Sequence, residues 1–381
     1  MRLLLLDPLF ENMEPSLQAG KPNQSILTIR VTEAKPLQGS LGVDNYSPPS
    51  VGSERVGINL SYLNLTGIGD VLSGSYYRTI QGGSSIFDFN YRVPLNAKDG
   101  ALQLRVSTNR NEIVESPFDK LNIRGSSELY EVSYRQPIVR STRQELALSL
   151  GFTFQDGQTF IFNSLPQRFG IGPDEDGVSR TSVVRFGQDY VLRDAGGAWS
   201  LRSQFNVGTG LFDATTNSNP TPDGVFFSWF AQGQRVQRLG DSHLLISQLD
   251  FQLTPDTLLP SQQFVIGGGQ SVRGYRQNAR SGDNGLRFLL EDRITVQRNA
   301  GGTAQLQLAP FVELGKVWNV SGNPNQLPDQ SFLLGAGLGV LWEPLPRLNV
   351  RLDYGFPVID LDDRGNNVQD DGFYFSVNYR F

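Results

Sequence analysis

Apolar and polar residues alternate with a period of two along most of the chain. The segment 146–154 (LALSLGFTF) has an apolar residue at every even position, and 87–93 (FDFNYRV) has one at every odd position. The same alternation returns in 348–354 and in the final segment, 373–381. Successive side chains of a strand point to opposite faces, so each segment has one apolar and one polar face. The pattern predicts strands and contains no convincing helix.

The length of these segments and the charges within them favour a membrane barrel. They run for about 9 to 13 residues, whereas soluble strands average about 5 to 6 and a tilted membrane strand needs about 9 to 11. Their polar faces carry charges far from the segment ends, such as Asp88, Arg92, Arg351 and Asp353. A dry sandwich core cannot accept these charges unpaired, but a water-filled lumen can. A soluble sandwich stays the alternative.

Sixteen such segments follow one another, and the connections between them alternate in length. Turns after even-numbered segments are short, as at 96–99 and 140–142, whereas most loops after odd-numbered segments are longer, as at 156–177 and 254–285. Short periplasmic turns and long outer loops are typical of bacterial barrels. An even strand number places both chain ends in the periplasm. The predicted strands start near residues 37, 53, 70, 85, 100, 126, 144, 178, 196, 224, 242, 286, 304, 331, 347 and 372.

Residues 1–36 differ from the barrel segments. Gln24–Val31 (QSILTIRV) predicts one strand, but a segment this short cannot bury a core of its own, which indicates the tail of a larger domain. The apolar run Leu3–Leu6 is far shorter than the roughly 20 residues of a membrane helix, and Asp7 follows it where a signal peptide would continue. Because an outer-membrane protein needs an export signal, we expect the natural protein to begin upstream.

The composition suits a wall that is apolar outside and polar inside. Apolar residues make up 38% of the chain, yet aromatic residues reach 10%, with 24 Phe and 12 Tyr. The chain contains no cysteine, which excludes disulfides and thiolate metal sites. Its 33 basic and 38 acidic residues nearly balance, so no basic footprint for nucleic acid is present.

Candidate catalytic and metal-binding residues are sparse. His243 is the only histidine, which leaves little for a zinc cluster or a Ser-His-Asp triad. The glycine-rich stretch 267–275 resembles a phosphate loop but lacks the Lys-Ser/Thr that should follow. An acidic segment near the C-terminus lacks the spacing of a calcium loop, which favours a solvated loop tip. We therefore predict no enzyme activity, no catalytic residue, no cofactor and no metal site. The aspartates of the acidic segment are Asp360, Asp362, Asp363, Asp370 and Asp371.

The longest predicted loop, 254–285, carries the most distinctive residues. Its stretch from residue 259 reads LPSQQFVIGGGQSVRGYRQNARSGDNG. Long loops in compact architectures are usually functional or disordered. Gly267, Gly268 and Gly269 permit sharp reversals and close approach to a wall. Arg273 offers a planar fork of five donors that suits a carboxylate.

This loop resembles that of a known family. Phe264–Tyr275 (FVIGGGQSVRGY), followed by Gly282–Gly285 (GDNG) at the next strand, is similar to the two-partner-secretion transporters, the haemolysin activation/secretion proteins of the outer-membrane translocator and insertase superfamily. Tyr91–Leu95 (YRVPL) and Leu352–Pro357 (LDYGFP) resemble that family's strand ends. The resemblance covers about 37–381. It implies an all-β, sixteen-stranded antiparallel transmembrane barrel with an inward-folded loop, in agreement with the strand count.

The resemblance also implies a lock between the loop and the wall. In the family, the motif matched by Val272, Arg273, Gly274 and Tyr275 folds into the lumen, and its arginine pairs with an acid on the thirteenth strand. The matching residues of that strand are Phe311, Glu313 and Gly315.

Alternation of the wall strands bears on this pairing. Leu306, Leu308, Val312 and Leu314 face lipid by alternation, so Glu313 faces the lumen. Glu313 stands where the family usually has aspartate, so Glu291, which also faces inward, stays open as a partner of Arg273. The same register turns Asp292 toward lipid, which indicates either a position near the rim or a register shifted by one.

Further expectations concern the two ends of the chain and its partners. The family has two periplasmic POTRA-like domains that capture unfolded substrate, and residues 1–36, with alternating Leu27, Ile29 and Val31, resemble the end of the second. Phe381 resembles the C-terminal aromatic recognised during barrel assembly, and it is also one more lipid-facing residue.

The resemblance implies three partners and one location. The expected partners are a secreted protein, outer-membrane lipid and the barrel-assembly machinery, without nucleic acid or nucleotide, and the expected location is a bacterial-type outer membrane. A barrel-assembly insertase, a simple porin and a barrel-borne hydrolase are the open alternatives.

Overall fold

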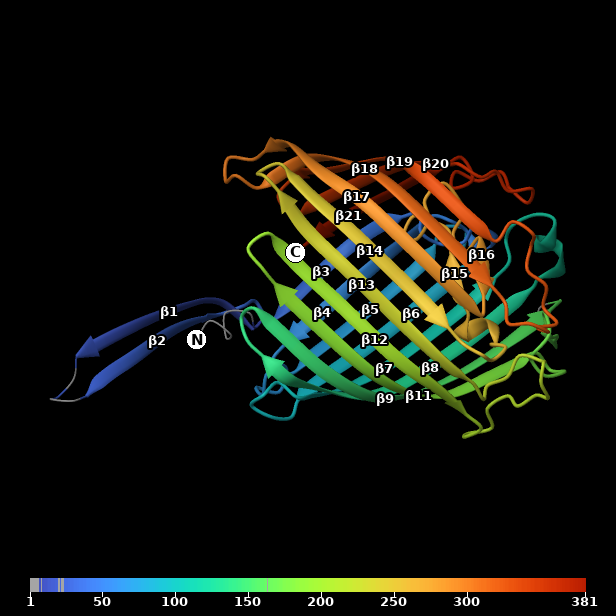
Figure 1. Cartoon of the computed structure of the whole chain (residues 1–381), viewed down its shortest axis with the longest axis horizontal. Coiled ribbons are helices and arrows are strands. Elements are labelled where there is room, and N and C mark those ends of the chain that lie inside the picture. Colours follow the sequence, from blue (N-terminus) through green and yellow to red (C-terminus); the bar gives the residue numbers. More distant parts are fainter. Residues whose placement is uncertain (1–6, 8, 20, 22–23, 163) are drawn as a thin grey trace.

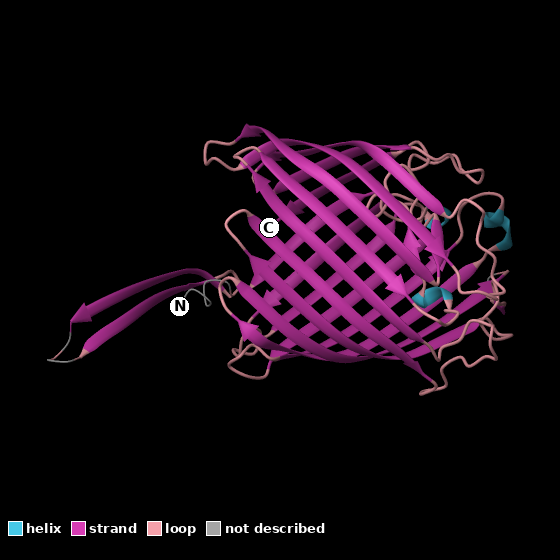
Figure 2. Ribbon diagram, in the orientation of Figure 1, coloured by secondary structure: helices cyan, strands magenta, loops and turns pink. Residues whose placement is uncertain are grey.

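Sixteen antiparallel strands close into a single barrel in the computed structural model (Figures 1 and 2), as the sequence predicts. The structure describes residues 7, 9–19, 21, 24–162 and 164–381. In chain order the wall strands are β3 (Leu37–Asp44), β4 (Arg55–Leu63), β5 (Val71–Thr79), β6 (Ser84–Pro94), β7 (Ala101–Glu112), β8 (Arg124–Arg140), β9 (Gln144–Ile161), β11 (Val178–Arg193), β12 (Gly197–Thr209), β13 (Phe227–Leu239), β14 (His243–Leu253), β17 (Asn284–Arg298), β18 (Ala304–Trp318), β19 (Phe332–Leu345), β20 (Leu348–Pro357) and β21 (Phe373–Arg380).

Strand lengths vary more than the alternation predicts. β8, β9 and β11 contain 17, 18 and 16 residues, so their hydrogen-bonded ladders continue beyond the membrane-spanning length. The two-residue strand β10 (Leu165–Pro166) pairs with the loop end of β9 and adds no further strand to the wall. In contrast, β3 and β21 contain only 8 residues each, and they meet where the barrel closes.

The two faces of the wall follow the alternation. Outward side chains are apolar and exposed, for example Leu150 at 59%, Leu352 at 53% and Phe87 at 43% exposure. The neighbouring positions, such as Asp88 and Asp353, point into the lumen, where they pair with arginines. The wall therefore has the apolar outside and polar inside of a membrane barrel. Among the described residues, no helix is long and apolar enough to cross a membrane.

The two ends of the barrel differ. Figure 1 shows the N-terminal hairpin beside the short turns at one end and the long loops at the other. Short 3-10 helices interrupt these loops, namely η2 (Pro49–Val51), η3 (Phe118–Leu121) and η4 (Pro260–Gln262). One connection at the loop end, 80–83 between β5 and β6, is short. The loop end therefore corresponds to the predicted outer side, and both described ends of the chain lie toward the predicted periplasmic side.

The barrel closes through a short seam between its first and last strands. β21 pairs with β3 over five residue pairs, from Ser376 with Asp44 to Arg380 with Ser40. Phe381 extends this pairing by exchanging backbone hydrogen bonds of 3.2 and 3.0 Å with Gly39. The seam is much shorter than the β9–β11 ladder, which runs over fifteen pairs.

Ahead of the barrel, β1 (Phe10–Ala19) and β2 (Ser25–Glu33) form an isolated hairpin. β2 matches the predicted strand Gln24–Val31. β1 was not predicted, because Pro15 lies in the middle of its sequence FENMEPSLQA and only Phe10, Met13 and Leu17 are large apolar residues. Leu27 and Ile29 of β2 are 54% and 37% exposed, and Met13 is the one buried apolar side chain among the described residues of the hairpin, which is too little for a core.

Candidate functional site

The longest loop folds back into the barrel. We call residues 254–283, which connect β14 to β17, the plug loop. Its short strands β15 (Phe264–Ile266) and β16 (Arg280–Gly282) pair with each other, and Figure 1 shows them at the loop end of the barrel. The tip between them, 267–279, carries the Val-Arg-Gly-Tyr motif.

Three consecutive glycines start the tip. Gly267 and Gly268 have φ values of +106° and +101°, a backbone conformation that other residues rarely adopt. A Cβ atom on Gly269 would lie 2.6 Å from the ring of Tyr46, so this glycine permits close approach to the wall. The three glycines therefore provide the sharp reversal and the close approach that the sequence predicts.

An apolar cluster fixes the plug loop to the wall. Val272 and Ile266 of the loop are fully buried, and a Cβ atom on Gly315 would lie 3.1 and 3.0 Å from their side chains. The missing side chain at position 315 therefore provides the space into which the loop packs. The cluster consists of Phe264, Ile266, Val272, Tyr275, Val317 and Leu333.

Arg273 lies at the centre of the site and is only 1% exposed. Its Nη2 atom lies 2.6 Å from Oε1 of Glu313 and 3.0 Å from Oε2 of Glu291, and its Nη1 atom lies 2.8 Å from Oδ1 of Asp353. Its backbone N–H also donates to Glu313, at 2.7 Å. Both acids considered from the sequence contact Arg273, and Asp353 adds a third that was not considered.

A second layer of arginines surrounds these acids. Arg351 donates to Glu291 and Asp353 at 2.7 Å each, and Arg293 donates to Glu291 at 2.8 Å. With Arg273, three guanidinium groups face three carboxylates, so the formal charges sum to zero. Buried ions are tolerated when each is paired and hydrogen-bonded. The guanidinium of Arg273 also stacks 3.3 Å from the centroid of the Phe311 ring.

The two residues after Arg273 complete the docking. Tyr374 accepts a hydrogen bond from the backbone N–H of Gly274 at 3.0 Å and donates one to the carbonyl of Tyr275 at 2.6 Å. The Tyr275 hydroxyl accepts from the backbone N–H of Leu334 at 3.2 Å. A Cβ atom on Gly355 would lie 2.5 Å from the nitrogen of Gly274. The wall therefore has no side chain at the point where the backbone of the plug loop contacts it.

A separate set of ties holds the plug loop to two outer loops. Arg276 makes a two-atom contact with Asp370, with a closest approach of 2.7 Å, and reaches Glu115 at 3.1 Å. Arg280 pairs with Asp363 at 2.8 Å. Three loops far apart in the chain are thus joined at the outer end of the barrel.

These ties correct the expectation of a solvated acidic tip. Asp370 is 4% exposed and Asp363 binds Arg280, so two of the five aspartates hold the plug loop. Burial opposes ionisation of Asp370, but hydrogen bonds from Arg276 outweigh it and keep its pKa below the ordinary value. Hydrogen bonds from Arg280 likewise lower the pKa of Asp363. Among the described residues, no group of three His, Cys, Asp or Glu side chains is placed to hold a metal ion.

Asp292 lies on the outer face of the wall, as the register predicts. Its carboxylate contacts Nδ1 of His243 at 2.8 Å. His243 is the first residue of β14 and follows a short turn, so the pair lies near the periplasmic rim. The position near the rim is therefore correct, and the register is not shifted, since Glu291 points inward. The single histidine takes part in this rim contact.

Comparison with known proteins identifies the family. Residues 23–341 match the family described as haemolysin secretion/activation protein ShlB/FhaC/HecB. The chain belongs to this family. Members are secretion proteins rather than a class of enzymes, and relatives are named outer-membrane transporters. The chain is therefore an outer-membrane barrel.

Individual relatives are distant in sequence. The outer membrane transporter CdiB of Dickeya dadantii is 22% identical over 277 residues, which cover 71% of this chain and 48% of that protein. The heme/hemopexin transporter protein HuxB of Haemophilus influenzae is 23% identical over 376 residues, which cover 95% of this chain and 63% of that protein. The chain thus spans about half to two thirds of the length of these relatives.

Solved structures share the fold. CdiB from Escherichia coli superposes with a TM-score of 0.81 at 19% identity and covers 100% of this chain and 69% of that one. BamA from Haemophilus ducreyi, lacking POTRA domains 1–3, gives a TM-score of 0.65 at 15% identity. The match covers 99% of this chain and 77% of that one.

Several residues of the site escaped the sequence analysis. Asp353 and Arg351 were recognised only as charges on a polar strand face, and Tyr374 was not singled out within the segment 373–381. Glu115 and Asp370 lie in loops, where alternation gives no direction. One signal for Asp353 was available in the sequence. It lies in the family-like stretch LDYGFP, and alternation turns it toward the lumen, where an acid is a candidate partner for Arg273.

Proposed function

We propose that the complete protein exports a secreted partner protein across the outer membrane through this barrel, without a nucleotide or cofactor. Membership of the secretion family and a lumen occupied by a docked plug loop support this function. An open porin needs no such lock inside its lumen, namely the buried Arg273 and the three buried acids that it contacts, Glu291, Glu313 and Asp353. The lock around Arg273 is the observation that carries the proposal.

The residues of the lock take specific roles in this proposal. Val272 and Tyr275 seat the plug loop, Gly274 lets its backbone touch the wall, and Arg273 binds the acids. Phe311 and Gly315 shape the wall that receives it. Glu313 is the principal partner of Arg273, and Glu291 is a second carboxylate that contacts the same guanidinium.

The chain ends take the remaining roles. We propose that residues 1–36, which include the β1–β2 hairpin, are the end of a POTRA-like domain that delivers the unfolded partner. Phe381 serves as the recognition residue for the barrel-assembly machinery, and the outward apolar side chains contact outer-membrane lipid. The first role is supported by the isolated hairpin, whose apolar side chains lack a core.

The direct test is a comparison of secreted proteins. The gene is deleted in its host, and the culture medium and cell surface are analysed by mass spectrometry. We expect the loss of one or a few large proteins, restored by the wild-type gene. Unchanged secretion in the deletion strain would refute export.

Barrel-assembly insertase is the second candidate. The fold similarity to BamA and the seam of only five residue pairs favour it. The same deletion strain discriminates the two, because loss of an insertase would lower the amounts of many other outer-membrane barrels. Loss of secreted protein with normal barrel levels favours export.

A further inference from the structure

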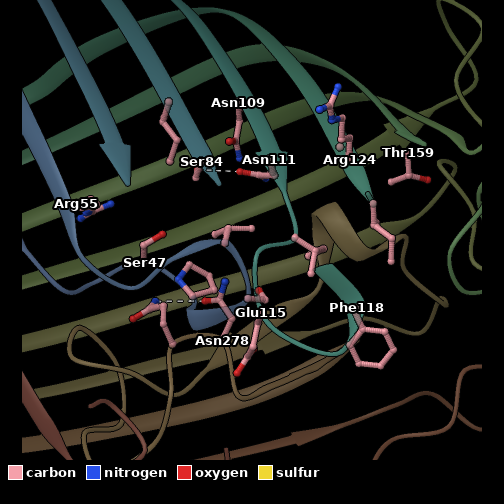
Figure 3. A pocket seen from close by; sticks show the side chains of 18 of the residues that line it. Ser47, Arg55, Ser84, Asn109, Asn111, Glu115, Phe118, Arg124, Thr159 and Asn278 are labelled. Carbon is pink, nitrogen blue, oxygen red and sulfur yellow. Dashed lines mark hydrogen bonds between the residues drawn. The ribbon is translucent and has the colours of Figure 1, made fainter. Parts of the chain in front are cut away.

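The plug loop leaves space on one side of the lumen. A cavity of about 760 Å³ lies between its tip and the inner wall at the outer end of the barrel (Figure 3). This volume lies within the roughly 300–1,000 Å³ of typical ligand sites. The plug loop contributes Gln270, Gln277 and Asn278, and the wall contributes Ser84, Asn109, Asn111 and Thr159, among others.

The lining of this outer cavity combines polar and apolar groups and has no uncompensated charge. Only three of its residues are charged, and each has a partner of opposite sign. The remaining lining consists of hydroxyl, amide and apolar side chains. Such a surface suits an uncharged ligand better than a strongly charged one. The three pairs are Arg55–Asp44 at 2.7 Å, Arg124–Glu112 at 3.2 Å and Glu115–Arg276 at 3.1 Å.

The outer cavity also contains an acceptor without a donor. The Oδ1 atom of Asn109 is buried and has no hydrogen-bond partner within the described part of the chain. Figure 3 shows Asn109 and Asn111 side by side over the cavity, both from β7. A buried acceptor without a donor costs free energy, which a backbone N–H of a bound peptide would offset.

Two further cavities lie along the same wall toward the periplasmic end. One of about 400 Å³ is lined by Ser61, Ser73 and Ser75, and one of about 590 Å³ is lined by Asn96 and Gln103. The inward residues of β6 line the three cavities in order: Ser84 and Ile86, then Asp88, then Asn90 and Arg92. One strand thus runs past all three cavities.

The lock of the plug loop lies across the lumen from this strand. β6 is the fourth wall strand, whereas the acids around Arg273 stand on the twelfth, thirteenth and fifteenth, β17, β18 and β20. Removing the loop from the lumen would leave Glu291, Glu313 and Asp353 without Arg273. A route along β6 leaves that lock intact.

Given the export function proposed above, we propose that the exported polypeptide passes in extended form along the β6 wall while the plug loop stays docked, and that the outer cavity binds an uncharged segment of it. An extended segment presents backbone N–H and C=O groups, which the Ser and Asn side chains of this wall can pair with.

One ion pair at the edge of the cavity joins two loops that border this route. Glu115 lines the outer cavity and belongs to the loop 113–123, while its partner Arg276 belongs to the plug loop. When Glu115 moves away, Arg276 keeps its two-atom contact with Asp370. Loss of the Glu115–Arg276 pair would therefore leave the plug loop bound to Asp370.

The absence of native cysteine allows a clean test. The thiol of an Asn111→Cys variant reports on the outer cavity, and that of a Gln248→Cys variant reports on an inward position of β14 that lines none of the three cavities. The purified variants are alkylated with a small maleimide, with and without an uncharged Gly-Ser-Asn repeat peptide. Ser84→Cys is the second cavity reporter if Asn111→Cys does not fold.

We expect the peptide to protect the cavity reporters alone. At a peptide concentration about ten times its Kd, alkylation should slow about tenfold. The rate at position 248 should not change, and polyglutamate and polylysine peptides should protect less. Equal rates with and without the peptide at both cavity reporters, or protection only at position 248, would overturn the proposed route. If secretion persists in spite of such a result, the route is refuted and the export function stands.

Discussion

Among the described residues of the site, Arg273 contacts the largest number of acidic side chains. Its guanidinium and backbone N–H together reach three carboxylates from three wall strands. The planar fork of arginine can do this, whereas the point charge of lysine cannot. The position of the plug loop therefore depends on the residue type at 273 as well as on its charge.

Replacement of Arg273 should loosen the plug loop and leave the barrel assembled. Arg273→Ala leaves three buried acids without this partner, and breaking a buried ion pair typically costs about 3–5 kcal/mol, reduced where lumen water reaches the site. We expect larger or less steady conductance in planar bilayers and reduced secretion. Arg273→Lys should be intermediate. Identical, large and steady conductance in wild type and Arg273→Ala would indicate a porin without a plug.

The two glutamates around Arg273 should not be equivalent. Glu313 accepts from Nε, Nη2 and the backbone N–H of Arg273, whereas Glu291 makes a single contact at 3.0 Å and also binds two other arginines. Glu313→Gln should therefore raise the frequency of conductance openings more than Glu291→Gln. An equal or larger effect at Glu291 would mean that the second arginine layer, not Glu313, holds the loop.

At the scale of elements, the acidic loop 358–372 makes docking dependent on pH. The pKa values of Asp370 and Asp363 are lowered in the folded protein. Their contribution to the docking of the plug loop is therefore fully present above pH 3.8, the ordinary aspartate pKa, and is lost as the pH falls through the lower folded values. Conductance should therefore stay constant from neutral pH down to that range and rise only in stronger acid. Asp370→Asn should reduce this acid-dependent change. A rise already near neutral pH would contradict this origin.

The seam offers a second prediction for an element. The ring of Phe381 covers Gly39, since a Cβ atom at Gly39 would lie 2.5 Å from it. An aromatic ring over a strand glycine stabilises a pair of strands. Phe381→Ala should lower the temperature at which the barrel unfolds in a gel mobility assay, even when the protein is purified and refolded without assembly machinery. Phe381→Tyr is the control. An unchanged unfolding temperature would leave recognition during assembly as the only role.

For the whole molecule, the two faces of the wall should respond differently to the same charge. Leu150 points outward from β9 and is 59% exposed, whereas Ser107 points into the lumen from β7 opposite Asp88. An arginine on the lipid face costs about 2–4 kcal/mol at the bilayer midplane, while lumen positions tolerate it. Leu150→Arg should reduce the folded fraction in lipid vesicles, and Ser107→Arg should not. Equal loss would mean that the two faces are assigned wrongly.

The whole barrel also separates two tasks. The strands β17–β21 hold the plug loop through buried ions, Tyr374 and glycine backbone, and the strands β4–β8 line open cavities. A closed wall permits this separation because opposite strands need no contact with each other.

The alternation of the sequence determined the wall. Sixteen strands, their inward and outward faces and the direction of Glu313 and Glu291 all follow from a period of two, because a strand side chain has only two directions. The hairpin strand β1 was missed, since Phe10–Ala19 has a proline at its centre and few large apolar residues. The motif residues of the plug loop were found through their resemblance to a family, not through periodicity.

Only the tertiary structure decided which residues meet. Arg273 lies 80 positions from Asp353, and Arg276 lies 161 positions from Glu115. Alternation fixes the direction of a side chain but not the depth of a loop in the lumen. That depth depends on apolar packing around Val272 and on the glycines of the wall, and these contacts arise only when the barrel closes.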